Sequence, residues 1–233
     1  RLDSRQGDDM AKAQKAAALI VAAGRGLRAE HAVPKQYQAI GRQAILARTI
    51  GLFLDHDSVD AVQVVIGEGQ REQYDAVAPA HPKLRPPVTG GETRQASVRS
   101  GLAALASAAP GRVLIHDAAR PFASAGLVSR VVDALGEHAA AVPTLPVAST
   151  LKRVEQGQVS GTVPRDGLGA AETPQGFAFA LIRDAHERAA AQGETFTDDA
   201  AVAEWAGAAV TTVAGEPANV KLTTAADIAA ADR

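Results

Sequence analysis

The chain has 233 residues, of which 46% are hydrophobic and 21% charged, with a formal net charge of −2 and no cysteine. This composition is ordinary for a globular protein with a substantial core, and it excludes a disulfide framework and a thiolate zinc site. The sequence shows neither an apolar stretch of transmembrane length nor the basic patch typical of nucleic-acid-binding proteins, so we expect a cytoplasmic protein that binds neither membrane nor nucleic acid.

The beginning of the chain is polar. "RLDSRQGDD" precedes the first apolar run, and residues 1–15 are predicted to form a disordered extension. The other end, "DIAAADR", is a helical pattern without a glycine cap, which is compatible with a chain cut from a longer protein.

Apolar runs typical of buried strands alternate with amphipathic helical patterns along residues 16–233. The predicted strands are 17–22, 61–67, 112–116, 139–145 and 208–214. Helical faces are formed by Ile45 to Phe53, Val98 to Leu105 and Leu127 to Leu135. This alternation predicts an α/β fold with a mostly parallel, Rossmann-like sheet and helices on both faces. Ligands of such sheets bind at the carboxyl ends of the strands.

One segment interrupts this alternation. Residues 149–169 are polar, with valines spaced around turn residues, and they predict a β-hairpin arm that leaves the globule. Because an isolated hairpin is at best marginally stable, we expect the arm to reach a partner subunit.

The loop after the first strand combines glycines with cations. Arg25 stands between Gly24 and Gly26, and Arg28 and Lys35 follow them. The match to a dinucleotide-binding pattern is loose, since Pro34 delays the helix and no acidic residue follows at the spacing that would hold a ribose. The loop suits a compact polyanion such as a nucleoside triphosphate, and a solvated basic loop is an equally acceptable interpretation.

Two later segments also follow strand-like runs. Asp117 and Arg120 lie in "HDAARPF", where a carboxylate can approach a metal or a hydroxyl, and Pro121 is expected to keep that loop exposed. In "TGGETRQAS" the amides of Gly90 and Gly91 could read a base edge, although Thr93 also suits a plain helix N-cap.

Two helix starts lie near the end of the chain. Thr197 is predicted to be the N-cap of the helix after "FTDDAA", and Thr224 with Asp227 forms a capping-box pattern. Lys221, just before the second of these helices, could reach a phosphate from the edge of the sheet.

Taken in order, "AAGRGLR", "PKQY", "GGETRQASV", "HDAARPF", "STLKR", "ETPQGF", "FTDDAA" and "NVKLTT" resemble one family, the 2-C-methyl-D-erythritol 4-phosphate cytidylyltransferases. The resemblance implies a nucleotidyltransferase domain over residues 16–233 and a homodimer formed through residues 149–169. It also implies Mg²⁺-dependent transfer of CMP from CTP to methylerythritol phosphate, with release of pyrophosphate in isoprenoid precursor biosynthesis. Some members of the family are fused to a downstream synthase domain.

The resemblance also implies roles for individual residues. Catalysis falls to Arg28, Lys35 and Lys221, and a metal would be held by Asp117. The residues expected to bind CTP are Ala22, Ala23, Gly24, Gly26, Gly91, Glu92 and Ser97. Those expected to bind the acceptor phosphate or its polyol are Asp117, Arg120, Thr150, Arg165, Thr173 and Thr197, with Arg165 reaching the partner's site.

The sequence departs from the family pattern at two positions. Glu92 and Ser149 stand where an aspartate is common. Three alternatives stay open at this point: a cytidylyltransferase acting on ribitol phosphate or another sugar phosphate, an NAD-dependent dehydrogenase, and a nucleotide-binding module without catalysis.

Overall fold

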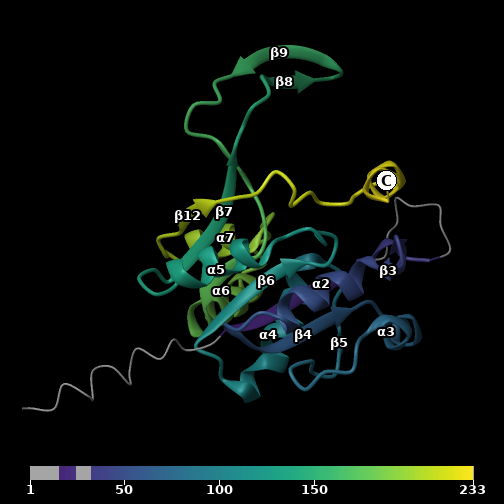
Figure 1. Cartoon of the computed structure of the whole chain (residues 1–233). Helices are drawn as coiled ribbons and strands as arrows, with labels where there is room; N and C mark the ends of the chain where they lie inside the picture. Colours follow the sequence, from purple (N-terminus) through teal and green to yellow (C-terminus); the bar gives the residue numbers. More distant parts are fainter. Residues whose placement is uncertain (1–15, 25–32, 233) are drawn as a thin grey trace, which may run out of the picture.

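The structure is a computed structural model that describes residues 16–24 and 33–232 (Figure 1). The predicted extension of residues 1–15 lies outside the described residues. Within the described part, a mixed sheet of eight strands forms the centre of the molecule. In spatial order its strands are β10 (Gly169–Ala171), β7 (Ala140–Pro146), β11 (Gln175–Ala178), β6 (Arg112–Asp117), β1 (Ala16–Ala22), β4 (Val59–Ile66) and β5 (Val88–Thr89), and β12 (Thr211–Ala214) pairs with β7.

The expectation of a mostly parallel sheet is confirmed. β1 pairs in parallel with both β4 and β6, β4 with β5, and β12 with β7. β10 and β11 are the antiparallel strands. The sequence patterns gave no sign of β5, β10 and β11, because each has only two to four residues and none alternates between polar and apolar side chains.

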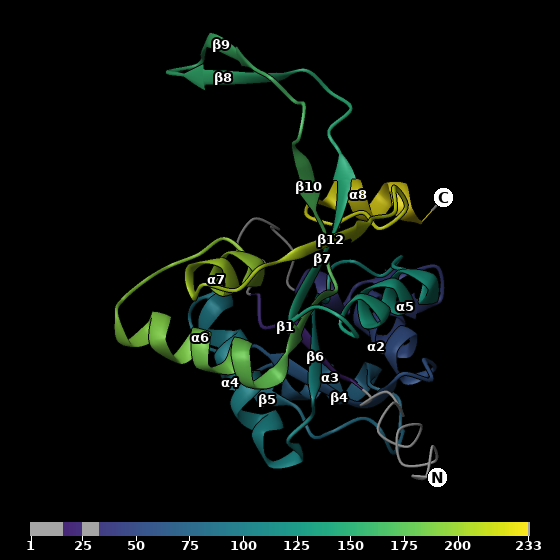
Figure 2. The ribbon, with the colours of Figure 1, turned by 90° about the vertical axis from the view of Figure 1, so that its left-hand side faces the viewer.

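Helices cover both faces of the sheet (Figure 2). The helices are α2 (Ile45–Leu54), α3 (Arg71–Val77), α4 (Arg94–Leu105), α5 (Ala125–Ala134), α6 (Phe179–Ala191), α7 (Asp199–Trp205) and α8 (Ala225–Ala231), with short 3₁₀ helices η1 (Lys35–Tyr37) and η2 (Ala106–Ala108). Not one helix within 16–24 and 33–232 is long and apolar enough to cross a bilayer.

The core is split into two halves by β1, whose side chains alternate between the two faces of the sheet. Ala18 and Ile20 pack with residues of α2 and α5, whereas Ala17 and Leu19 pack with residues of α4, α6 and α7. All four side chains are fully buried. The continuous apolar run of β1 is therefore what a strand covered on both faces requires.

The predicted hairpin is present as strands β8 (Leu151–Glu155) and β9 (Gln158–Val163), which form a separate two-stranded sheet. It projects away from the central sheet beyond β7 and β10 (Figures 1 and 2). Gln156 and Gly157 both have positive φ, as the tight turn of a two-residue hairpin loop demands. Val154 and Val159 face each other across the pair and are 60% and 63% exposed. A second short hairpin joins β2 (Ala39–Ile40) to β3 (Gln43–Ala44).

Candidate active site

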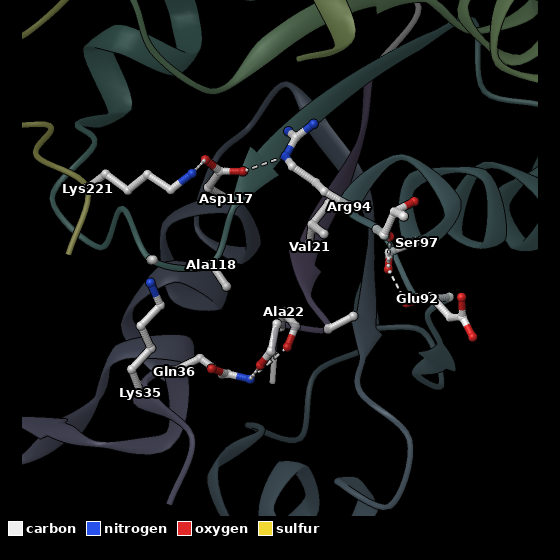
Figure 3. Close-up of a pocket in the computed structure, with 15 residues that line it drawn as sticks. Val21, Ala22, Lys35, Gln36, Glu92, Arg94, Ser97, Asp117, Ala118 and Lys221 are labelled. Atoms are coloured by element: carbon white, nitrogen blue, oxygen red, sulfur yellow. Dashed lines mark hydrogen bonds and ion pairs between the residues drawn. The ribbon is translucent and has the colours of Figure 1, made fainter. Parts of the chain in front are cut away.

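A pocket of about 290 Å³ lies where β1 and β6 end and α4 begins (Figure 3). Its position agrees with the rule that ligands of α/β sheets bind at the carboxyl ends of parallel strands. The residues that line it are Val21, Ala22, Ala23, Gly24, Lys35, Gln36, Gly91, Glu92, Thr93, Arg94, Ser97, Asp117, Ala118, Ala119 and Lys221. Nine of the sequence-predicted site residues are among them: Ala22, Ala23, Gly24, Lys35, Gly91, Glu92, Ser97, Asp117 and Lys221.

The turn after β1 is held by a glutamine. The side-chain amide of Gln36 donates to the carbonyl oxygens of Ala22 at 2.8 Å and Gly24 at 3.1 Å. Gln36 is buried, so these bonds are shielded from water. The adjacent Lys35 directs its Nζ to the carbonyl oxygen of Leu222 at 2.9 Å, which ties the first loop to the segment that carries Lys221.

Of the two glycines before α4, Gly90 has a role different from the one expected for it. The amide of Gly90 donates to the carbonyl of Ile66 at 2.8 Å and therefore does not face a base; that part of the expectation is wrong. A Cβ on Gly90 would lie only 2.6 Å from Cβ of Ala23, so glycine permits the close approach of this loop to the end of β1. Gly91 lines the pocket, as do Glu92 and Ser97. Figure 3 labels the last two on the pocket wall.

Asp117 lies between two cations. Its Oδ1 is 3.1 Å from Nε of Arg94 and its Oδ2 is 2.7 Å from Nζ of Lys221. Burial by itself would raise the pKa of Asp117, but the charges of Arg94 and Lys221 outweigh it and hold the pKa well below its usual range. Asp117 is therefore an ionised carboxylate at neutral pH, surrounded by positive charge.

Arg94 was not among the predicted site residues. It is the first residue of α4, after the N-cap Thr93, where a cation opposes the positive end of the helix dipole. A cation in that position is a signal that the side chain has an anionic partner, and Asp117 is one such partner.

The loop after β6 is held by buried hydrogen bonds and is largely covered, which corrects the expectation of an exposed loop. The amide of Leu222 donates to the carbonyl of Ala119, and Pro121 is buried. Arg120 donates from Nη1 to the carbonyl of Asn219 at 2.7 Å and does not line the pocket. The predicted grouping of Asp117 with Arg120 is replaced by contacts of Asp117 with Arg94 and Lys221.

Four other predicted residues do not line the pocket. Thr173 is buried behind Asp117 and accepts a hydrogen bond from its amide at 3.1 Å. Thr150 and Thr197 are exposed, and Arg165, also exposed, donates to the carbonyl of Ala148, the residue just before the arm. Gly26 and Arg28 lie outside the described residues, so their predicted roles stay predictions.

The cap of α7 is one residue later than expected. Asp198, not Thr197, is the N-cap, and its carboxylate accepts from the amide of Ala201 at 2.9 Å. The backbone of Asp198 is extended, as an N-cap requires. The capping box of Thr224 and Asp227 at the start of α8 is confirmed.

A model of the 2-C-methyl-D-erythritol 4-phosphate cytidylyltransferase family, IspD, matches residues 16–233. The chain belongs to the IspD family. Among solved structures, the IspD enzyme of Thermus thermophilus superposes with a TM-score of 0.78 at 36% identity, covering 94% of this chain and 97% of that one. The 4-diphosphocytidyl-2C-methyl-D-erythritol synthase of Anaerococcus prevotii superposes with a TM-score of 0.81 at 29% identity, covering 96% of this chain and 97% of that one.

Longer IspD relatives carry a second enzyme name. The bifunctional enzyme IspD/IspF of Nitrobacter winogradskyi is 50% identical over 220 residues, which make up 94% of this chain and 55% of that protein. The chain thus spans about half the length of the curated relatives it matches. Family membership decides against the dehydrogenase alternative and agrees with the resemblance drawn from the motifs.

Proposed function

We propose that this chain transfers CMP from CTP to 2-C-methyl-D-erythritol 4-phosphate and releases pyrophosphate, as the family name describes. The observation that carries the proposal is the pocket at the ends of β1 and β6, whose wall carries Lys35 together with Arg94 and Lys221, the two cations paired with the ionised Asp117. The proposal includes a cytoplasmic location, with which a chain that has no cysteine for disulfides is compatible.

The chemistry explains why such a pocket needs positive charge. The acceptor phosphate and the α-phosphate of CTP are both anions, and they repel each other as they approach. Cations fixed around the pocket reduce this repulsion and stabilise the charge on the phosphoryl oxygens in the transition state. A phosphate monoester is already a nucleophile at neutral pH, so the reaction needs no serine or cysteine nucleophile and no general base.

Within this proposal the pocket divides into two sides. Gly91, Glu92 and Ser97 contact the cytosine and its ribose, and the turn of Ala22 to Gly24 with Lys35 holds the triphosphate. Lys221 and Asp117 lie on the opposite side, where the acceptor phosphate would enter. Arg28 and Gly26 would complete the triphosphate site. Arg120 and Thr173 would support the acceptor side from behind the pocket wall, through their contacts with Asn219 and Asp117. Thr150 and Thr197 would contact the acceptor from outside the pocket.

A magnesium ion fits this donor set in one way. Within the described residues no three acidic or histidine side chains gather into a metal site, and Asp117 is a pocket-lining carboxylate that its neighbours hold ionised. Mg²⁺ commonly takes one or two protein carboxylates and completes its shell with substrate phosphates and water. We propose Asp117 as its single protein ligand; the ion would supply charge neutralisation of the triphosphate.

The proposal also includes a homodimer formed through residues 149–169. It is supported by the exposed valines of a hairpin that has its own small sheet and projects from the globule. In the dimer, Arg165 would reach the site of the partner subunit.

The proposed reaction is tested with CTP, methylerythritol phosphate and Mg²⁺, followed by pyrophosphate detection. Release of pyrophosphate that depends on this acceptor supports the proposal. Release with ribitol phosphate instead would assign another sugar-phosphate acceptor, and CTP binding without turnover of either acceptor would indicate a non-catalytic nucleotide-binding protein.

The cation of Lys35 gives a second test. We expect Lys35→Ala to lower kcat by roughly 10²–10³-fold, the usual cost of removing one transition-state donor. Lys83→Ala is the matched control, because Lys83 also donates to backbone carbonyls, those of Leu54 and His56, but lies outside the pocket. A Lys35→Ala enzyme with a kcat close to that of wild type would remove Lys35 from the mechanism.

A further inference from the structure

A series of ionic contacts runs from the pocket into the interior, beyond Asp117. Nη2 of Arg94 lies 2.8 Å from Oδ2 of Asp199, and Oδ1 of Asp199 lies 3.0 Å from Nε2 of His186. Asp199 and His186 are 1% and 0% exposed, and neither lines the pocket. The family motifs drew attention to Thr197 in this segment and gave Asp199 no role.

The burial of the Asp199 carboxylate is energetically costly and calls for compensating contacts. Removing an ion from water costs several kcal/mol, and the cost is offset only by close partners of opposite charge or strong hydrogen bonds. Burial would raise the pKa of Asp199, but Arg94 and His186 together hold it below its usual range. Asp199 is therefore an ionised group in the core whose main charged partner is a residue of the pocket wall.

The geometry of Arg94 shows what this contact does. Its guanidinium uses Nε for Asp117 and Nη2 for Asp199, so two carboxylates hold one planar group at two different nitrogens. A guanidinium held at two nitrogens has a defined orientation, which a single ion pair on a long side chain would not give. In turn, Oδ1 of Asp117 has a fixed donor on the side away from Lys221.

We propose that Asp199, oriented by His186, is a positioning residue that holds the guanidinium of Arg94 against Asp117 and thereby fixes the carboxylate of the pocket. The contacts link α6, α7, α4 and β6 in that order, from His186 to Asp117. Asp199 touches no substrate in this account and acts through Arg94. The inference rests on the proposed cytidylyltransferase function, which it deepens.

The test compares Asp199→Asn, Arg94→Gln and the double variant with wild type. Asparagine keeps the size of Asp199 and removes its charge, so we expect kcat/KM to fall by about 10- to 100-fold, as for other residues that orient a ligand from behind. In the double variant we expect kcat/KM to equal that of Arg94→Gln within about threefold, because two residues that act through one contact are not additive.

Stability separates positioning from a purely structural role. Arg94→Gln leaves the buried charge of Asp199 without its arginine, so we expect the Tm of the double variant to be at or above that of Arg94→Gln, with no recovery of activity. A wild-type kcat/KM in Asp199→Asn, or a further loss beyond about threefold when it is added to Arg94→Gln, would overturn the proposal.

The control is Glu187→Gln, which breaks an exposed ion pair of 2.9 Å between Arg99 of α4 and Glu187 of α6, the neighbour of His186. This variant should keep the wild-type kcat/KM, since the ion pair that it breaks joins helices α4 and α6 away from the pocket. If wild type releases no pyrophosphate, the proposed function fails by itself. Calorimetric titration of the same variants with CTP and Mg²⁺ then tests the inference, with weakened binding in Asp199→Asn and equal affinity in Arg94→Gln and the double variant.

Discussion

Both ring nitrogens of His116, a buried residue beside Asp117, have hydrogen-bonding partners. Its Nδ1 lies 3.0 Å from Oγ1 of Thr173 and its Nε2 lies 3.0 Å from the carbonyl oxygen of Arg120. Burial lowers the pKa of His116 from 6.5 to about 4, so the ring is neutral at pH 7. A neutral ring donates from Nε2 to Arg120 and accepts at Nδ1 from Thr173, whose oxygen accepts in turn from the amide of Asp117.

This burial makes stability depend on pH. Between about pH 4 and 6.5, His116 is protonated in the unfolded chain and neutral in the folded protein. The free energy of unfolding therefore falls as the pH is lowered through this range. The loss for a shift of this size is on the order of 3 kcal/mol. Urea unfolding of wild type and His116→Gln at pH 7 and pH 4.5 measures it. Equal losses in the two proteins would contradict the assignment.

The position of a site residue was predictable where the residue belongs to a short sequence motif. It was less predictable where the contacts of the residue are made only in the folded protein. Lys35, Asp117 and Lys221 line the pocket as predicted, because each stands in a short motif, "PKQY", "HDAARPF" or "NVKLTT", that the family resemblance singled out. Arg94 and Gln36 were missed, since their partners are distant in the sequence and meet them only when β6, α7 and the turn after β1 converge. Thr197 lost its capping role to Asp198, because two adjacent residues that can both cap are indistinguishable by pattern alone.

At the scale of elements, α4 determines much of the pocket, since it carries Arg94 and Ser97 and packs on β1 and β4. Gly101 is its closest approach to the sheet, where an added Cβ would overlap the side chain of Leu19 and lie 2.8 Å from Cγ2 of Val65. Glycine in a helix otherwise costs up to about 1 kcal/mol relative to alanine. Its presence here is explained by packing.

Gly101→Ala is therefore expected to destabilise the protein in spite of the gain in helix propensity, by about 1–3 kcal/mol for an overpacked core. Gly51→Ala is the matched control, because nothing lies within 4 Å of a Cβ at this position of α2. Thermal unfolding should show a lower Tm for the first variant and an unchanged or higher Tm for the second. A rise in Tm for both would show that α4 can move off the sheet without cost.

The elements themselves were largely predictable, because long buried strands appear as continuous apolar runs and amphipathic helices carry strong periodicity. β1, β4, β6 and β7 and helices α2, α4 and α5 follow the predicted runs closely. β10 and β11 were not, since their pairing with β7 and β6 is non-local and owes nothing to their own pattern.

At the scale of the whole molecule, the arm of β8 and β9 forms a sheet of its own and projects from the globule (Figures 1 and 2). We expect the double variant Val154→Asp, Val159→Asp to convert the proposed dimer, about twice 23.9 kDa, into a monomer, because it places charge where apolar side chains are predicted to be buried. Light scattering after size exclusion gives the mass. Gln158→Asp, on the opposite face of β9, is the control that should stay dimeric. A wild-type protein that is monomeric at all concentrations would refute the role of the arm.

Glu172 directly follows β10, the strand by which the chain returns from the arm, and its buried carboxylate accepts from the amide of Glu216 and from Nδ2 of Asn219. Asn219 lies two residues before Lys221. The side chain of Glu172 therefore connects the base of the proposed dimerisation arm to the segment that carries Lys221, a proposed catalytic residue. Replacing or regrafting the arm is thus also an alteration of the reaction centre, and an engineered monomer should be judged by the placement of Lys221 as well as by its mass.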